Sequence, residues 1–262
     1  MKVVIIGSGA SWPDSERSSP SQALVMDEEA PLLFDCGPGS GLNLMRAGIN
    51  PATISRIFLT HLHMDHSLEF PSLVFAGYLA GRKEKVQLYG PQGTVDFCRS
   101  FFEKIYPSAP EIVRRMREDG WNVTANEVAQ GLVSDSNGFR VVSAPVEHEI
   151  PAVAYRIETD EGVVVISGDT RPCRSLIQLA KGADLLLHEC SFPDDMSEIA
   201  RITNHSTPSE VGNVASKAAV KGVVLTHLFP HWSGREKEMT ESVSAKFGGK
   251  VIIARDLLEI TI

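Results

Sequence analysis

One short segment constrains this chain more than any other. The apolar run 57–59 is followed by Thr60-His61-Leu62-His63-Met64-Asp65-His66, which places three histidines and an aspartate within six residues. Side chains alternate along an extended chain, so His61 and His63 are expected on the same side. Clustered imidazoles repel one another when protonated and need partners when buried. Imidazole and carboxylate together suit Zn²⁺, and less readily Mn²⁺ or Fe²⁺, so the segment predicts a metal site.

Three later apolar runs also end in a residue that can bind a metal. They are Ala144-Pro145-Val146-Glu147-His148, Ile166-Ser167-Gly168-Asp169 and Leu225-Thr226-His227. Sites on sheet scaffolds are often built at the carboxyl ends of strands. With the first segment, these runs supply the candidate ligands His61, His63, Asp65, His66, His148, Asp169 and His227. This set is large enough for two divalent ions that share a bridging carboxylate.

The apolar runs also predict the architecture. Short β-branched runs predict strands at 3–6, 32–34, 57–59, 86–89, 140–143, 153–157, 163–166, 185–187, 223–225 and 251–253. Apolar residues at three- and four-residue spacing predict helices at 40–47, 67–79, 94–105, 173–180 and 209–219. This order favours mixed sheets with helices packed outside, in one domain over residues 1–262. Residues 106–138 are the least readable, and both a lid and an insertion stay open for them.

Charge and cysteine content narrow the class of protein. The net charge of −8 is a poor match to a nucleic-acid binder, whose phosphate contacts need clustered cations. The four cysteines form no CxxC pair, so a reducing, cytoplasmic location is the simplest expectation. The chain starts with a short apolar run that we expect to be a first strand and not a signal peptide. Since no apolar window is long enough for a bilayer span, no membrane association is expected.

The HxHxDH pattern, followed by His, Asp and His at separate strand ends, resembles the metallo-β-lactamase-fold hydrolases. Within that superfamily, further stretches of the sequence are similar to the ribonuclease Z branch. The matching stretches lie at residues 7–10, 33–37, 58–63, 145–148, 155–158, 167–171, 187–190, 204–207 and 225–227, with Arg17 and Ser21. They span nearly the whole chain. The fold that this resemblance implies is an αββα sandwich of two mixed β-sheets, with helices on the outer faces and the site at one edge.

The resemblance also implies how the ligands are divided. One metal ion would be held by His61, His63 and His148, the other by Asp65, His66 and His227, with Asp169 bridging the two. Asp35 would orient a ligand from behind. Two such cations, Zn²⁺ first and Mn²⁺ or Fe²⁺ as alternatives, lower the pKa of a bound water from about 15.7 toward about 7 and so supply hydroxide as the nucleophile.

Several further residues receive roles from the same resemblance. Asp65 is a ligand whose free oxygen can accept the proton of the water. His205, just before a predicted helix, is assigned as the proton donor to the leaving oxygen, or to the developing charge on the phosphate. His188-Glu189 is expected either beside the site or as a purely structural buried pair. His231 is expected either at the mouth of the pocket or simply exposed.

The chain departs from the ribonuclease Z pattern in one informative place. The members that process tRNA carry a long arm between the positions of His148 and Asp169, whereas residues 149–168 here read as a plain hairpin. We therefore expect a dinuclear phosphodiesterase acting on a small-molecule or short nucleic-acid phosphodiester, without an extended nucleic-acid grip. The alternatives are a tRNA 3′-end endonuclease and a metal-dependent sulfatase, lactonase or thioesterase-like hydrolase. The apolar helix at 70–79 is a candidate surface for a homodimer.

Overall fold

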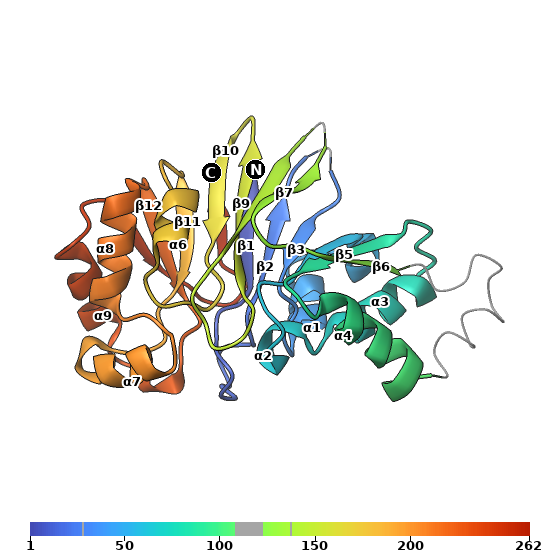
Figure 1. The fold of residues 1–262 in the computed structure, drawn as a ribbon, viewed down its shortest axis with the longest axis horizontal. Helices are drawn as coiled ribbons and strands as arrows, with labels where there is room; N and C mark the ends of the chain where they lie inside the picture. The colour runs from blue at the N-terminus through green and yellow to red at the C-terminus, as the bar shows by residue number, and fades with distance from the viewer. Residues whose placement is uncertain (28, 108–122, 137) are drawn as a thin grey trace.

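Two mixed β-sheets pack face to face in this chain and carry helices on both outer sides (Figure 1). The structure is a computed structural model, and it describes residues 1–27, 29–107, 123–136 and 138–262. The predicted αββα sandwich of two mixed sheets is therefore confirmed. None of the described helices combines the length and the apolar character that a bilayer span requires.

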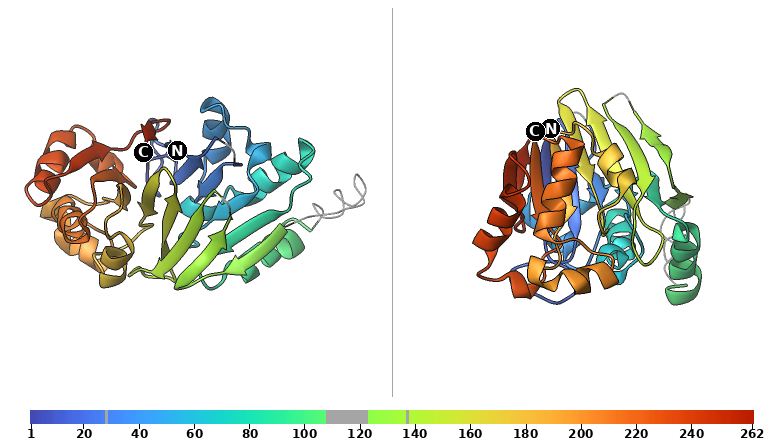
Figure 2. Two further views of the ribbon diagram at one scale, coloured as in Figure 1. Left: turned by 90° about the horizontal axis from the view of Figure 1, so that it is seen from above. Right: turned by 60° about the vertical axis from the view of Figure 1, so that its left-hand side comes forward.

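The first sheet has the strand order β14-β1-β2-β3-β4-β5-β6. Its strands are β1 (Lys2–Gly7), β2 (Ser21–Val25), β3 (Leu32–Phe34), β4 (Arg56–Phe58), β5 (Val86–Gly90), β6 (Val123–Glu127) and β14 (Glu259–Thr261). Pairing is antiparallel from β14 to β3 and parallel from β3 to β6. Because β14 pairs with β1, the two termini lie side by side (Figure 2).

The second sheet has the order β13-β12-β11-β10-β9-β8-β7. Its strands are β7 (Gly131–Asp135), β8 (Arg140–Pro145), β9 (Val153–Thr159), β10 (Gly162–Ile166), β11 (Leu185–Glu189), β12 (Gly222–Thr226) and β13 (Lys250–Ile253). Pairing is parallel from β13 to β10 and antiparallel from β10 to β7. The parallel strands β10, β11 and β12 run in the same direction, so the segments that follow them leave the sheet at one edge.

Helices cover the two outer faces of the sandwich. On the first sheet lie α1 (Ser40–Arg46), η1 (Pro51–Thr53), α2 (Met64–Ser67), α3 (Phe70–Leu79), α4 (Thr94–Ser100) and the π-helical turn η2 (Phe101–Ile105). On the second sheet lie α6 (Arg174–Leu179), α8 (Pro208–Ala218) and α9 (Glu236–Ser244), and the short elements η3 (Asp194–Met196), α7 (Ser197–Ile202) and η4 (Pro230–Trp232) are found beside them. Three apolar clusters result, one between the sheets and one under each helix layer.

The two sheets are in direct contact where the metal-site motif begins. The ring of Phe58 on β4 stacks on Phe34 at 4.9 Å and meets Tyr155 of β9 edge-on at 5.6 Å. The Tyr155 hydroxyl donates a 2.8 Å hydrogen bond to the Leu59 carbonyl. The amide of Val153 donates to the Thr60 carbonyl at 2.8 Å. Two hydrogen bonds thus fasten the end of β4 to the opposite sheet, immediately before His61.

The structure corrects several boundaries of the sequence prediction. All ten predicted strands are present, but β2, β6, β7 and β14 are missed because polar residues interrupt their apolar pattern. The helix predicted at 67–79 begins three residues later, at Phe70, and Ser67 instead ends the separate helix α2, since Pro71 has no N–H to continue the hydrogen-bond ladder from α2 into α3. Within the segment left open at 106–138, residues 123–127 and 131–135 are strands and not a lid. Residues 108–122 and 137 of that segment lie outside the described residues.

Candidate metal centre

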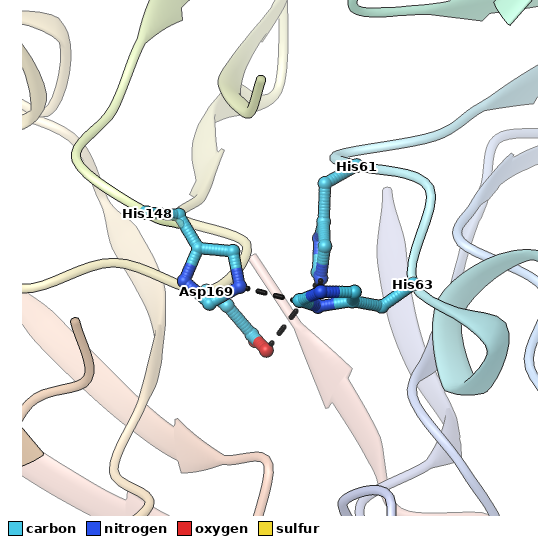
Figure 3. Close-up of side chains that lie close together, drawn as sticks. All are labelled: His61, His63, His148 and Asp169. Carbon is cyan, nitrogen blue, oxygen red and sulfur yellow. Dashed lines mark hydrogen bonds and ion pairs between the residues drawn. The ribbon is translucent and has the colours of Figure 1, made fainter. Parts of the chain in front are cut away.

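The candidate ligands follow strand ends from both sheets. His61 and His63 come after β4, His148 after β8 and Asp169 after β10 (Figure 3). These four side chains point toward one another from three separate segments. Their ligand atoms all lie within 4.8 Å of one another. Residues as far apart in sequence as His61 and Asp169 are thus gathered by the packing of one sheet on the other.

Within this first set, His63 lies close to both other histidines. Its Nδ1 lies 3.0 Å from Nε2 of His61 and 3.2 Å from Nε2 of His148. Nε2 of His61 lies 3.7 Å from Oδ2 of Asp169. Three imidazole nitrogens and a carboxylate oxygen around one point are a donor set that suits Zn²⁺ and related divalent ions.

A second set is formed by Asp65, His66 and His227, again with ligand atoms within 4.8 Å of one another. Asp65 and His66 lie on the single-turn helix α2, and His227 follows β12. Oδ2 of Asp169 lies 3.4 Å from Nε2 of His66 and 3.1 Å from Nε2 of His227. The Asp169 carboxylate therefore lies between the two sets, and the structure brings together all seven residues singled out by the sequence.

The backbone around these side chains adopts uncommon conformations. Asp35, Asn204 and His227 all have φ between 53° and 58°, a region that costs a residue with a side chain about 1–3 kcal/mol. Gly168, directly before Asp169, has φ of 61°, and a Cβ at that position would lie 2.6 Å from the Thr60 side chain. Strain of this kind collects where the surrounding structure fixes a functional geometry.

Asp35 holds the start of the motif from behind. Its Oδ1 accepts a hydrogen bond from the Thr60 amide at 2.7 Å, and its Oδ2 accepts one from the Thr60 hydroxyl at 2.8 Å. The same Oδ2 lies 2.8 Å from Nδ1 of His66. With Nδ1 engaged in this way, the His66 ring presents Nε2 toward the cluster. This is the orienting contact that metal-binding histidines usually have.

Glu189 and Ser191 hold the opposite side of the site. Nδ1 of His205 lies 3.1 Å from Oε1 of Glu189, and the Ser191 hydroxyl lies 2.9 Å from Nδ1 of His227. Glu189 also accepts hydrogen bonds from the amides of Ser206 and Ser191. From the sequence, both a place beside the site and a structural role were open for Glu189, and no role was predicted for Ser191. A lone serine after a His-Glu pair carries no pattern that marks it.

Burial and neighbouring charges set the protonation of the cluster. Burial lowers the pKa of His61 well below its usual value, and the charge of His66 adds to this effect. Burial opposes ionisation of Asp169, but the attraction of His227 and His66 outweighs it and keeps the pKa of Asp169 well below its usual value. Asp65 behaves in the same way through its hydrogen bond with His227, and its pKa falls to about 2. Ionised carboxylates and a neutral His61 are the forms that bind metal ions.

Unsatisfied polar atoms show that the cluster suits a cation. Nε2 of His66 and Oδ1 of Asp169 are buried and have no hydrogen-bond partner among the described residues. A buried polar atom without a partner costs about 1–3 kcal/mol. Divalent ions that accept these lone pairs would remove this cost, and the donor set consists of atoms that such ions prefer. The residues present therefore fit the metal ions that the fold implies.

The structure also places the residues whose predicted position was undecided. Nδ1 of His188 is bonded to the Glu189 carbonyl, and its Nε2 is buried outside both ligand sets, which matches the purely structural alternative. His231 is half-buried and stacks on Phe229, so it is not simply exposed. Glu149, for which the sequence predicted no role, lies 3.3 Å from Nε2 of His63. An exposed glutamate in a loop gives no signal in the sequence.

Comparison with known proteins agrees with this geometry. The profile of the Beta-lactamase superfamily domain matches residues 31–228. Ribonuclease Z of Methanothermobacter thermautotrophicus is 30% identical over 284 residues, which cover 90% of this chain and 89% of that protein. Ribonuclease Z of Methanosarcina acetivorans is 29% identical over 311 residues, covering 100% and 98%. The crystal structure of the short form of human tRNase Z has a TM-score of 0.80 and 26% identity, covering 100% of this chain and 99% of that one.

The fold and the ligand cluster define a metal-dependent hydrolase that binds divalent metal ions. The chain belongs to the β-lactamase superfamily, and within that superfamily it is a ribonuclease Z-like protein. Both resemblances drawn from the sequence are thereby confirmed.

The hydrogen bonds of Asp35 lead to a first prediction. In Asp35→Asn, an amide group replaces an oxygen that now serves the Thr60 hydroxyl and His66. We expect affinity for Zn²⁺ to fall about 10- to 100-fold, because the His66 ring loses its orienting contact. Competition with a chromophoric chelator measures this affinity. Asp160→Asn, in the turn between β9 and β10, is the matched control. Unchanged affinity in folded Asp35→Asn protein would contradict the role given to Asp35.

Proposed function

We propose that this hydrolase is a dinuclear-metal phosphodiesterase that acts on a small or flexible phosphodiester. The observation that carries the proposal is the position of Asp169, whose Oδ2 lies 3.7 Å from Nε2 of His61 in one ligand set and 3.1 Å from Nε2 of His227 in the other. A carboxylate between two donor sets suits a pair of ions with a shared ligand. When bound, such a pair supplies Lewis acidity toward the phosphate oxygens and an activated water as the nucleophile.

The two ligand sets in this proposal follow the division implied by the sequence. His61, His63 and His148 form one, Asp65, His66 and His227 form the other, and Asp169 is shared. Imidazole and carboxylate donors without a thiolate support Zn²⁺ as the ion, with Mn²⁺ and Fe²⁺ as alternatives. The second oxygen of Asp65 is the group that we assign to accept the proton of the nucleophilic water.

His205 is the residue that we assign to the leaving group. It lines the same cavity as Asp65 and Asp169, and its ring stacks on His227 at 5.4 Å. Burial disfavours a charge on this ring, but Glu189 and its hydrogen bond outweigh burial and raise the pKa of His205 to about 9. Because Glu189 is bonded to Nδ1, Nε2 is left to donate a proton to the leaving oxygen.

The path of the chain after His148 supports a small substrate. Strands β9 and β10 pair as a tight hairpin, in which Gly162 lies opposite Thr159. This hairpin occupies the position at which an arm that grips tRNA would be inserted. The alignment with the Methanosarcina protein runs over 311 positions, more than the 262 residues of this chain, so that relative contains additional segments. The name of that relative, ribonuclease Z, supports tRNA 3′-end cleavage as the second candidate function.

Metal content and diester turnover test the proposal together. We expect about two metal equivalents per chain by elemental analysis, and turnover of bis(p-nitrophenyl) phosphate with Zn²⁺ or Mn²⁺. His63→Ala should lose turnover and one equivalent, because His63 contacts both His61 and His148. His231→Ala, an imidazole outside both sets, should keep the metal.

Three other outcomes would redirect the assignment. Fewer than one metal equivalent in folded protein would overturn the dinuclear centre. Accurate cleavage of a pre-tRNA after its discriminator base, at a higher efficiency than any small diester, would favour the second candidate. Turnover of sulfate esters, lactones or thioesters with no phosphodiester activity would indicate a metal-dependent sulfatase, lactonase or thioesterase-like hydrolase instead.

The role of His205 has its own test. In His205→Gln we expect kcat for a diester with an alkyl leaving group to fall about 10²- to 10⁴-fold, because the leaving oxygen loses its acid. For p-nitrophenolate, which leaves without a proton, the loss should be small. Metal content should stay unchanged. Since Asp169, His205 and His227 also lie within 4.8 Å of one another, loss of metal would instead make His205 a ligand.

The helix α3 supports a proposal about assembly. Leu79 at its end and Leu42 and Met45 on α1 are exposed, and a cavity of about 320 Å³ between α1, η1 and α3 is lined by Leu73 and Ala76. We assign this apolar surface to contact with a second copy of the chain. The double variant Met45→Glu with Leu79→Glu should shift the protein from dimer to monomer in sedimentation velocity. Leu132→Glu, an exposed leucine on β7, is the control. A monomeric unmodified protein would refute the assignment.

The state of the cysteines supports a proposal about the cellular compartment in which the protein acts. All four are buried and free. Free thiols without disulfides are typical of a reducing environment. This supports the cytoplasm as the place in which the enzyme acts.

A further inference from the structure

The loop between β1 and β2 carries an exposed tryptophan at the metal centre. Trp12 is 66% exposed, and among the described residues it makes no ring contact with another aromatic side chain. It nevertheless lines the cavity of about 830 Å³ that contains Asp65, Asp169 and His205. In Figure 1 this loop is the blue segment that projects at the lower edge of the molecule. A large apolar ring facing solvent at a reaction site is a feature of ligand recognition.

The base of the loop that carries Trp12 is fixed by hydrogen bonds. Asp256 accepts hydrogen bonds from the amide and hydroxyl of Ser8 at 2.9 and 2.8 Å, and from the amide of Ser18 at 2.7 Å. The Arg17 guanidinium donates to the Ser8 hydroxyl at 2.8 Å and to the Ala254 carbonyl at 2.6 Å. The two ends of the loop are therefore joined to each other and to the C-terminal segment.

The loop is also tied to the segment that follows β12. The amide of Leu228 donates to the Ser8 carbonyl at 3.0 Å, and Gly9 forms a bridge with Leu228. Leu228 lies between His227, a candidate ligand, and Phe229, which lines the same cavity. Phe229 is itself supported by stacking on Phe192 at 5.5 Å. One cavity thus has two aromatic side chains on connected backbone segments, next to the metal centre.

The charges around this cavity argue against a polyphosphate. Outside the candidate ligands and His205, the charged side chains that line it are Asp14, Glu149 and Arg17. Nη1 of Arg17 donates both of the hydrogen bonds that fix the loop. Additional phosphates would therefore meet the two carboxylates of Asp14 and Glu149 and only the one guanidinium of Arg17, so negative charge predominates where they would lie. Hydroxyl or amino groups, by contrast, can donate hydrogen bonds to these carboxylates.

We infer that Trp12 stacks on an aromatic ring carried by one ester group of the substrate, so that the site takes a nucleoside or aryl phosphodiester with no further phosphate. The inference rests on the proposed phosphodiesterase function and names its substrate class. Trp12 acts as a specificity-determining residue, because the ring that it contacts lies away from the bond that breaks. Stacking of a base on an aromatic side chain is insensitive to which base is present.

Binding of two phosphonates to the metal-loaded protein tests this inference. Thymidine 5′-methylphosphonate carries the single charge of a diester and a base, whereas ethyl methylphosphonate carries the charge alone. In Trp12→Ala we expect the calorimetric Kd of the thymidine compound to rise about 10-fold and that of the ethyl compound to stay unchanged. Trp12→Phe should retain most of the affinity. Ile202→Ala, which removes an apolar side chain that is 65% exposed outside this cavity, is the matched control and should change neither Kd.

A second arm tests the number of phosphates. Adding a 3′-phosphate to the thymidine compound should weaken its binding to the unmodified protein, and Asp14→Asn with Glu149→Gln should reduce that penalty. Equal changes for both phosphonates in Trp12→Ala, or no change, would overturn the stacking role. Tighter binding of the 3′-phosphate compound would overturn the single-phosphate assignment. Absence of bis(p-nitrophenyl) phosphate turnover would contradict the proposed function alone, because the Kd values are measured without turnover.

Discussion

The carboxylate of Asp169 is the charge around which this site is arranged. It is buried between histidines from both ligand sets, with His61, His66 and His227 within 3.1–3.7 Å of one oxygen. Burying a carboxylate is costly unless positive charge or hydrogen bonds compensate for it. The compensation here comes from side chains at the ends of β4 and β12 and on α2. The requirement to satisfy one buried charge therefore links the packing of the two sheets to the chemistry at their edge.

Around this charge, a second layer of contacts fixes each ring. Asp35 engages Thr60 and His66 on the side of the first sheet, and Glu189 with Ser191 engages His205 and His227 on the side of the second. Left-handed backbone at Asp35, Asn204 and His227 adds a local cost that the folded structure must offset. The rings are thus oriented at a cost in stability, as expected where ligands must be preorganised before an ion or a substrate arrives.

The sequence predicts the ligand cluster well because its signal is local. The ligand segments follow apolar runs that form strands. The carboxyl ends of strands that run in the same direction lie at one edge of a sheet, and this does not depend on the conformation of the loops. Most strands follow from similarly clear apolar patterns, whereas the αββα architecture was implied by the resemblance to the metallo-β-lactamase-fold hydrolases. Strands such as β7 and β14 lack that pattern, since edge strands are half-exposed and carry polar residues. Ser191, Glu149 and Trp12 were missed as site residues because their positions depend on contacts between distant segments, which no single stretch of sequence records.

The origin of the ligands from two different sheets has a consequence for folding. His61, His63, Asp65 and His66 belong to the half of the chain that builds the first sheet, and His148, Asp169 and His227 belong to the half that builds the second. Neither half contains a complete donor set on its own. An ion bound by either donor set would be coordinated by residues from both sheets and would therefore cross-link them. Release of the ion and separation of the sheets are therefore thermodynamically linked, so scarcity of metal would lower the free energy of unfolding as well as the activity.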